Sequence, residues 1–389
     1  MRKAGMAVLA AVFSMIMSNA WANDEARLQF RNAIRTLERV QDATASGDRS
    51  AVDVQSKLIV QIETDLMSAK KVDLQDVRNL RAIATYLFSG GNPNIAERRL
   101  ISMDINPENK HLLDGALAYA RGEKANAIKF LGDVNLANLP PNLGGRVALV
   151  KAILVSAEDL KAALNLLGTA GALMPGTLVE EAALRRCVSF AGKLPDIEQL
   201  ELCASLYIRR FRQSVYWQEF EDSFTLGLIQ ADYIKAGGSM PRLKFILNDL
   251  PSVDNREMLL VISKAAVGRG RFLLAKACAA RAFEMSRADS VEMTRANLYA
   301  GAAMIVQEDH AAGKRKLESI EKSKLDPSDK ALLGKALELT RQIASRPDIT
   351  EEQAIKSLSP AELRDNQSPA YTSLLARAQN ALADSRPLK

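Results

Sequence analysis

The chain has 389 residues, of which 48% are hydrophobic and 5% aromatic, and its formal net charge at pH 7 is +6. This charge is mild for the length, so nothing in it requires a nucleic acid as partner. The two histidines and three cysteines form no Cys-x-x-Cys or His-Glu-x-x-His pattern, which argues against a metal centre.

The first 22 residues have the pattern of a secretory signal peptide. Arg2 and Lys3 give a positive start, residues 4–17 are apolar, and an Ala-Trp-Ala cleavage motif ends at Ala22. Cleavage there removes the two basic residues and lowers the formal charge from +6 to +4. No later run approaches about 18 consecutive apolar residues. We therefore expect a soluble chain that is exported to the periplasm and does not insert into a membrane.

Helical periodicity begins after this leader and is interrupted only by short turns. Helices are expected over residues 23–47 and 50–70, then from a cap at Asp73 to a stop at Gly90, and a fourth to about Ser102.

Pairs of helices with small residues at their contact faces follow. In residues 112–131, Gly115, Ala118 and Ala127 let two antiparallel helices approach closely, and Gly122 makes the turn, so the unit resembles a tetratricopeptide repeat. Similar pairs are expected at residues 146–173, 178–211, 258–285 and 293–320. No run alternates with period two. The sequence predicts an all-α, elongated, helical-hairpin solenoid over residues 23–344.

The helix that begins after Pro175 has a strong start signal. Thr177 and Glu180 have the spacing of a capping box, so the Glu180 carboxylate is expected to accept from the Thr177 amide. Glu181 and Arg185 are four residues apart and are expected on the more solvated side of the same helix.

The three cysteines leave at least one thiol unpaired in a monomer. Cys187 and Cys203 lie eight residues on either side of Pro195, where we expect the turn of a helix hairpin, so they can face each other. They either form a disulfide in the oxidising periplasm or, with Cys278, are small buried core residues.

Residues 345–389 differ from the solenoid because prolines divide them into short helical pieces. The last expected helix, residues 368–383, has one narrow apolar face. Such a helix is not stable alone, so we expect it to dock either on the solenoid or on a partner.

We expect no catalytic residue, cofactor site or small-molecule substrate. His111 and His310 have no nucleophile motif nearby, and the paired carboxylates at 180–181 and 351–352 fit the preference of helix N-termini for negative charge. The enzyme alternative is a peptidoglycan-active lyase. The sequence argues against it because no compact, aromatic-rich domain is expected after the solenoid.

Aromatic residues and arginines gather between residues 207 and 233. Aromatic and Arg enrichment is typical of interface hot spots. One hypothesis is that Arg209, Arg210, Arg212 and Tyr216 form an exposed patch that binds an acidic surface of a periplasmic partner. The alternative is that the aromatic set belongs to the core between helices; its members are Tyr207, Phe211, Trp217, Phe220 and Phe224.

Four segments carry a resemblance to a known family. They are Tyr86-Leu-Phe-Ser-Gly-Gly-Asn-Pro, Leu139-Pro-Pro-Asn-Leu-Gly-Gly-Arg-Val-Ala-Leu-Val-Lys, Pro175-Gly-Thr-Leu-Val-Glu-Glu-Ala-Ala-Leu-Arg-Arg and Tyr207-Ile-Arg-Arg-Phe. Together they resemble the MotC family of exported motility proteins of alphaproteobacteria. The resemblance implies a periplasmic, non-catalytic protein that is required for flagellar rotation and binds the periplasmic part of the stator protein MotB. It assigns no binding residue. The alternative is a generic periplasmic helical-repeat scaffold for envelope assembly.

Overall fold

The structure is a computed structural model that describes residues 30–101, 103–194, 197–306 and 310–344. The expected signal peptide and the expected helix over residues 368–383 lie outside these ranges. The chain divides into two compact units, Met1–Lys330 and Ala331–Lys389.

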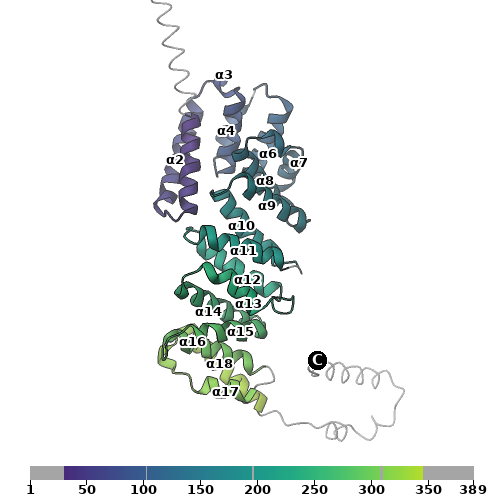
Figure 1. Ribbon diagram of the computed structural model, residues 1–389. Helices are drawn as coiled ribbons and strands as arrows, with labels where there is room; N and C mark the ends of the chain where they lie inside the picture. The colour runs from purple at the N-terminus through teal and green to yellow at the C-terminus, as the bar shows by residue number, and fades with distance from the viewer. Residues whose placement is uncertain (1–29, 102, 195–196, 307–309, 345–389) are drawn as a thin grey trace, which may run out of the picture. The chain divides into compact units, whose positions relative to one another are not determined.

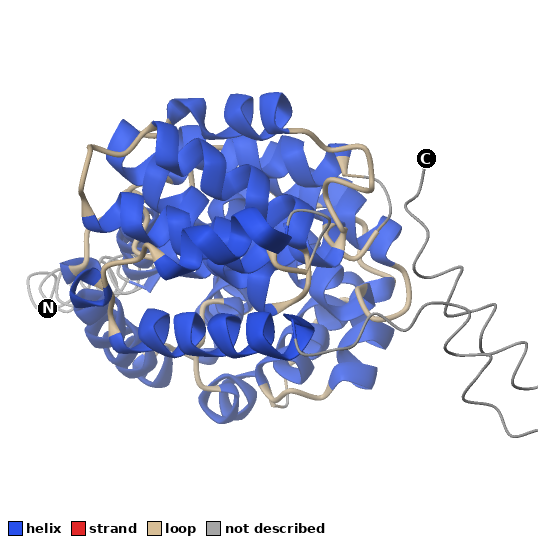
Figure 2. Ribbon diagram, turned by 90° about the horizontal axis from the view of Figure 1, so that it is seen from below, coloured by secondary structure: helices blue, strands red, loops and turns tan. Residues whose placement is uncertain are grey.

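Every regular element of the described residues is a helix, and no strand occurs among them (Figure 2). A helix over residues 30–45 comes first. The next helices are α2 (Ser50–Ser68), α3 (Lys71–Leu74), α4 (Val77–Phe88), α5 (Pro93–Leu100), α6 (Pro107–Ala120), α7 (Lys124–Gly132), η1 (Leu136–Asn138), α8 (Pro141–Val155), α9 (Leu160–Leu173) and α10 (Leu178–Ala191). Then come α11 (Glu198–Phe211), α12 (Trp217–Gln230), α13 (Met240–Ile246), η2 (Leu247–Asp249), α14 (Ser252–Gly268), α15 (Phe272–Glu284), α16 (Val291–Met304), α17 (His310–Glu318), η3 (Lys322–Lys324) and α18 (Pro327–Ala344). The all-α prediction is therefore confirmed.

Helices that follow each other in sequence pack side by side within the first unit. The pairs α6 with α7, α8 with α9, α10 with α11, α14 with α15 and α16 with α17 are in contact, and α9 with α10 and α15 with α16 join one pair to the next (Figure 1). This consecutive packing fits the predicted stack of helical hairpins.

Glycines with left-handed backbone conformations end the first helix of two such pairs. Gly122 has φ +75° and Gly270 has φ +71°. After each of them, the next amide donates back into the helix, from Glu123 to Ala118 O at 2.9 Å and from Arg271 to Ala266 O at 2.8 Å. This is the Schellman arrangement, which glycine adopts without a steric penalty. The turn expected at Gly122 is thus in place.

The start of α4 differs from the sequence expectation. Asp73 lies in the short helix α3, and the cap of α4 is Asp76, whose carboxylate accepts from the Arg78 amide at 2.9 Å. The two aspartates are three residues apart, and only the second one directly precedes the apolar face of α4. The face itself is buried from Leu80 to Leu87.

Close helix contacts depend on residues that lack a side chain. A Cβ atom added at Gly115 of α6 would lie 2.6 Å from the Leu131 side chain of α7, which supports the role predicted for this glycine. A Cβ at Gly192, just after α10, would lie 2.4 Å from the Gly227 Cα of α12. In both places a larger residue would force the helices apart.

Candidate interaction site

The aromatic residues of α11 and α12 form part of the core. Tyr207 and Phe220 stack with ring centroids 4.0 Å apart and planes 4° apart, and Phe211 and Phe224 are tilted or stacked against them. All four are buried, whereas Trp217 is half-buried. The core alternative therefore holds for these four rings, and they offer no surface to a partner.

A buried carboxylate lies beside this aromatic cluster. Glu181 of α10 is fully buried, accepts a hydrogen bond from the Tyr207 hydroxyl at 2.6 Å and pairs with Arg185 at 3.1 Å. The expectation that Glu181 faces solvent was wrong. Glu181 and Arg185 do pair across one helical turn. The Tyr207 hydroxyl, however, supplies a buried donor that makes burial of the Glu181 charge tolerable.

Three other buried tyrosines repeat this pairing with a carboxylate from a helix distant in sequence. Each of the four hydroxyls donates to a carboxylate: Tyr86 to Glu63 at 3.0 Å, Tyr207 to Glu181 at 2.6 Å, Tyr233 to Glu201 at 2.7 Å and Tyr299 to Asp329 at 3.0 Å. Burial raises the pKa of all four hydroxyls well above the usual 10, so they remain protonated donors. The sequence gives no signal for these pairs, because the partners lie 23 to 32 residues apart.

The start of α10 is not capped as its sequence predicts. The Thr177 hydroxyl donates to Met174 O at 2.7 Å, and the Glu180 carboxylate accepts from the Gly176 amide at 2.6 Å instead of the Thr177 amide. The free Leu178 amide is satisfied by Asp42, from the helix over residues 30–45, at 2.9 Å. A tertiary contact thus replaces the local capping box.

That first helix also contacts other elements distant in sequence. Gln41 accepts from the buried Arg146 of α8 at 3.1 Å, and Arg146 also donates to Ser89 at 3.3 Å. Farther along, Thr44 O accepts from the Val215 amide at 3.1 Å. The first helix therefore ties α8, α10 and the loop before α12 together.

The predicted arginine patch is exposed, but each of its guanidinium groups has a partner within the chain. Arg209 pairs with Asp249 at 3.1 Å, and Arg212 donates to the backbone oxygen of the same residue at 3.3 Å. Arg210 pairs with Glu180 at 2.5 Å. Arg209 and Arg212 thus meet at η2, and Arg210 points to the start of α10.

The fourth predicted residue of the patch lies apart from the arginines. Tyr216 is half-buried, and its ring lies under the guanidinium of Arg185, 5.0 Å from ring centroid to Cζ. The structure therefore does not gather the four residues into one cluster.

A shallow groove of about 540 Å³ lies between α11 and α13. Leu202 and Phe245 line it with 53% and 71% of their surfaces exposed, and Arg209 also lines it. The ion pair between Arg242 and Glu201, at 2.5 Å, borders it as well. This is an apolar surface next to the arginine side, and sequence periodicity did not reveal it.

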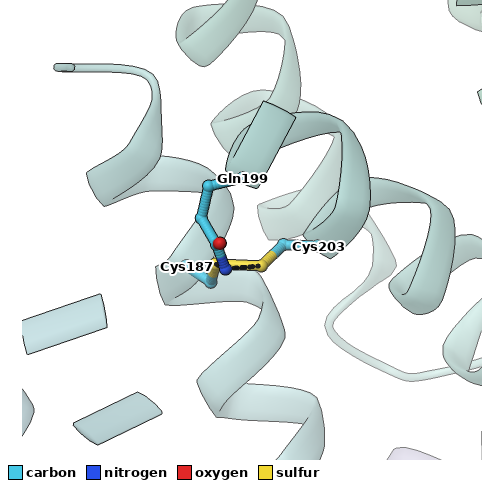
Figure 3. The surroundings of a disulfide bond; sticks show 3 residues. All are labelled: Cys187, Gln199 and Cys203. Carbon is cyan, nitrogen blue, oxygen red and sulfur yellow. Dashed lines mark hydrogen bonds between the residues drawn. A yellow bond between two sulfur atoms is a disulfide. The ribbon is translucent and has the colours of Figure 1, made fainter. Parts of the chain in front are cut away.

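Two cysteines are joined in the hairpin of α10 and α11. Figure 3 shows the disulfide between Cys187 and Cys203, with the Gln199 side chain beside both sulfur atoms. The two Cα atoms are 6.1 Å apart. Cys278 is a free, buried thiol whose pKa is raised by burial.

The described residues contain neither a cluster of metal ligands nor a membrane-spanning helix. No group of three or more His, Cys, Asp or Glu side chains there is placed to hold a metal ion. No helix in the same part of the chain is long and apolar enough to cross a bilayer.

The chain is similar to one family of known proteins over nearly its whole length. A family model described as chemotaxis protein MotC matches residues 1–388. The chain belongs to the MotC family. Chemotaxis protein MotC of Rhizobium meliloti (strain 1021) is 29% identical over 373 residues, which cover 95% of this chain and 84% of that protein. No solved structure matches. Membership in the MotC family makes this a motility- or chemotaxis-related protein.

Proposed function

We propose that this protein is a periplasmic, non-catalytic motility factor that is required for flagellar rotation and binds the periplasmic part of the stator protein MotB. The observation that carries the proposal is the match of the MotC family model over residues 1–388. The helical-hairpin stack supports it, because such stacks present extended surfaces for protein partners and need no chemistry.

Export supports the same proposal from the sequence side. The signal-peptide pattern of residues 1–22 directs a chain out of the cytoplasm, and a disulfide such as Cys187–Cys203 persists in an oxidising compartment. A fractionation experiment checks the location. The mature chain should appear in the periplasmic fraction, and a chain lacking residues 1–22 should stay in the cytoplasm.

A deletion strain tests the motility role. We expect cells without this protein to assemble flagella and keep an intact envelope but fail to swim, with swimming restored by the gene on a plasmid. A leaky envelope with normal swimming would instead favour a general envelope scaffold. Purified MotB periplasmic domain should bind the purified protein; no binding would contradict the proposed partner.

The arginine side of α11 is the surface we propose for this contact. Replacing Arg209 and Arg212 together by Gln removes two exposed charges, and we expect weaker, less salt-sensitive binding of the MotB domain. Gln is preferred to Glu because a Glu at position 209 would face the Asp249 carboxylate. Arg210 is left unchanged because it pairs with the buried Glu180. Arg98→Gln, at an exposed position of α5, is the matched control. Equal binding by all variants would remove this surface from the proposal.

A further inference from the structure

Two ion pairs connect α11 to the segment of α13 and η2 that runs beside it. Arg242, in the first turn of α13, pairs with Glu201 of α11 at 2.5 Å, and Asp249, the last residue of η2, pairs with Arg209 of α11 at 3.1 Å. Glu201, Arg209 and Arg242 also line the groove between the two helices. Glu201 and Arg209 are eight positions apart, which is about 12 Å along a helix axis. The groove between the ion pairs is therefore about two helical turns long.

Apolar side chains lie between these ion pairs. On α11 they are Leu202 and Leu206, four positions apart and thus on one side of the helix, and on α13 they are Phe245 and Ile246. Phe245 has 71% of its surface exposed, the largest fraction of any large hydrophobic side chain in the described ranges. An exposed apolar surface with charged residues around it is typical of a binding groove.

The charges at the groove favour an uncharged occupant. Glu201, Arg242 and Arg209 each have an oppositely charged partner within the chain, so a charged side chain of a ligand has to compete with an existing ion pair. An apolar side chain meets no such competition, and it removes apolar surface of the groove from water. The result is an apolar centre with a polar rim, which is the usual composition of a protein interface.

The lining of the groove also indicates the conformation of the occupant. Binding by strand addition requires a sheet edge, and the described residues contain no strand. Proline-rich segments dock in grooves lined by aromatic rings, whereas Phe245 is the only aromatic residue among the described residues that line this groove. An apolar groove between helices suits an amphipathic helix, whose anchors at i, i+4 and i+7 span two turns. A stable homodimer covers about 800 Å² on each copy, which is more than two turns of one helix provide.

We propose that the groove between α11 and α13 binds two turns of an amphipathic helix of a protein partner. The helix places uncharged apolar side chains against Leu202, Leu206 and Phe245. This inference deepens the proposed function and rests on it for the identity of the partner. It adds an apolar contact, insensitive to salt, beside the salt-sensitive contact proposed for Arg209 and Arg212.

The groove is tested first without that partner. The full chain is titrated with a short, neutral, fluorescent peptide of alanine and glutamine that carries three leucines on one helical face. A control peptide of the same composition has its leucines distributed around the helix. We expect the parent to bind the first peptide more tightly than the control. No binding of the first peptide, or equal binding of the two, overturns the proposal.

Exposed apolar residues supply the variants for this titration. Leu202→Gln/Phe245→Gln should weaken binding of the first peptide about tenfold, which corresponds to about 1.4 kcal/mol. Phe245→Gln alone should show a smaller loss. Val60→Gln is the matched control, because Val60 lies on α2 with 61% of its surface exposed, and it should stay within about twofold of the parent. Equal losses in the double variant and in Val60→Gln contradict the assignment of the groove.

Salt dependence and oligomeric state test the other occupants. Since the charges at the groove are paired, the affinity for the peptide should change less than about twofold between about 0.01 and about 0.15 M salt. A tenfold fall would show that charges carry the binding, and an apolar occupant would be wrong. Sedimentation equilibrium should show the parent and the double variant in the same state. A dimer that the double variant abolishes would assign the groove to a second copy instead.

Titration with the MotB periplasmic domain separates the two proposals. If Leu202→Gln/Phe245→Gln weakens binding of both the peptide and the MotB domain, both proposals are supported. If the MotB domain binds the parent and the double variant equally well, the proposed function stands and the groove is overturned as its contact. If the peptide binds in the groove but the MotB domain does not bind the parent at all, the groove stands and the proposed partner fails.

Discussion

The carboxylate of Asp42 caps α10 by accepting a hydrogen bond from the Leu178 amide, with Oδ1 and N 2.9 Å apart. The two residues are 136 positions apart in the sequence. An N-cap is usually supplied by the residue before the helix. Here the cap comes from the first described helix, so folding of that helix and the start of α10 are coupled.

Removing this cap should destabilise the protein. Asp42→Ala leaves the Leu178 amide without its acceptor, and we expect the free energy of unfolding to fall by about 1 kcal/mol. Asp42→Asn keeps an oxygen acceptor at the same place and should cost less than half as much. Urea denaturation followed by circular dichroism measures both. Equal losses in the two variants would mean that the charge, and not the cap, matters.

Asp42 should change the stability of the protein with pH in the direction opposite to that of an ion-paired carboxylate. Burial, the largest cause, raises its pKa above the ordinary 3.8. The folded protein therefore holds this proton more tightly than the unfolded chain, and the resulting stability is complete below pH 3.8 and lost as pH rises through the raised pKa. Asp42→Asn cannot titrate. The unfolding free energy of the parent minus that of the variant should therefore decrease as pH rises from 3.8 through the raised pKa, and stay constant at higher pH.

The Tyr207 hydroxyl contributes to stability through Glu181. Tyr207→Phe keeps the stacked ring but removes one donor from a fully buried carboxylate, and we expect a loss of about 1–3 kcal/mol. Tyr216→Phe is the control, because the half-buried Tyr216 hydroxyl makes no hydrogen bond to the described residues. Chemical denaturation of both variants decides the matter. If they lose the same small amount, the Tyr207 hydroxyl does not stabilise Glu181.

Two glycine substitutions should have opposite effects. At Gly192 an added Cβ would lie 2.4 Å from the Gly227 backbone, so Gly192→Ala must separate α10 from α12 and should cost about 1–3 kcal/mol. At Gly168, inside α9, nothing lies within 4 Å, so Gly168→Ala should stabilise the helix by about 0.5–1 kcal/mol. Melting curves of the two variants check this. A stabilised Gly192→Ala would show that the two helices are not in close contact.

The disulfide prediction concerns both stability and labelling. Cys187 and Cys203 close a loop of 16 positions, and reduction should lower the unfolding free energy by about 3 kcal/mol. The Cys187→Ala/Cys203→Ala variant should not respond to reductant. In denaturant without reductant, alkylation should add one label per chain, at Cys278. Three labels would mean that the two thiols are free.

Local sequence patterns were enough to predict helices, their turns and the antiparallel pairing of neighbours. Gly122 is a clear case, since a glycine after an apolar periodic run needs only its own backbone freedom to end a helix. The close approach at Gly115 followed from the same local reasoning. The pairing of Cys187 with Cys203 was left open, because spacing shows that two residues can meet and not that they do.

The same patterns failed wherever a distant residue decided the outcome. Thr177 and Glu180 have the spacing of a capping box, yet Asp42 supplies the cap of α10. Glu181 carries a charge and was expected in water, yet the Tyr207 hydroxyl and Arg185 satisfy it in the core.

The sequence by itself determined that this protein is helical, that its helices form pairs and, through its motifs, which family it resembles. Helix period, glycine turns and small contact residues act over a few positions, so they can be read along the chain. Only the tertiary structure decided which polar groups are buried and paired. Burial of a charge depends on donors and acceptors that folding brings together from distant helices. For the same reason, only the structure shows that Arg209, Arg210 and Arg212 already have partners within the chain.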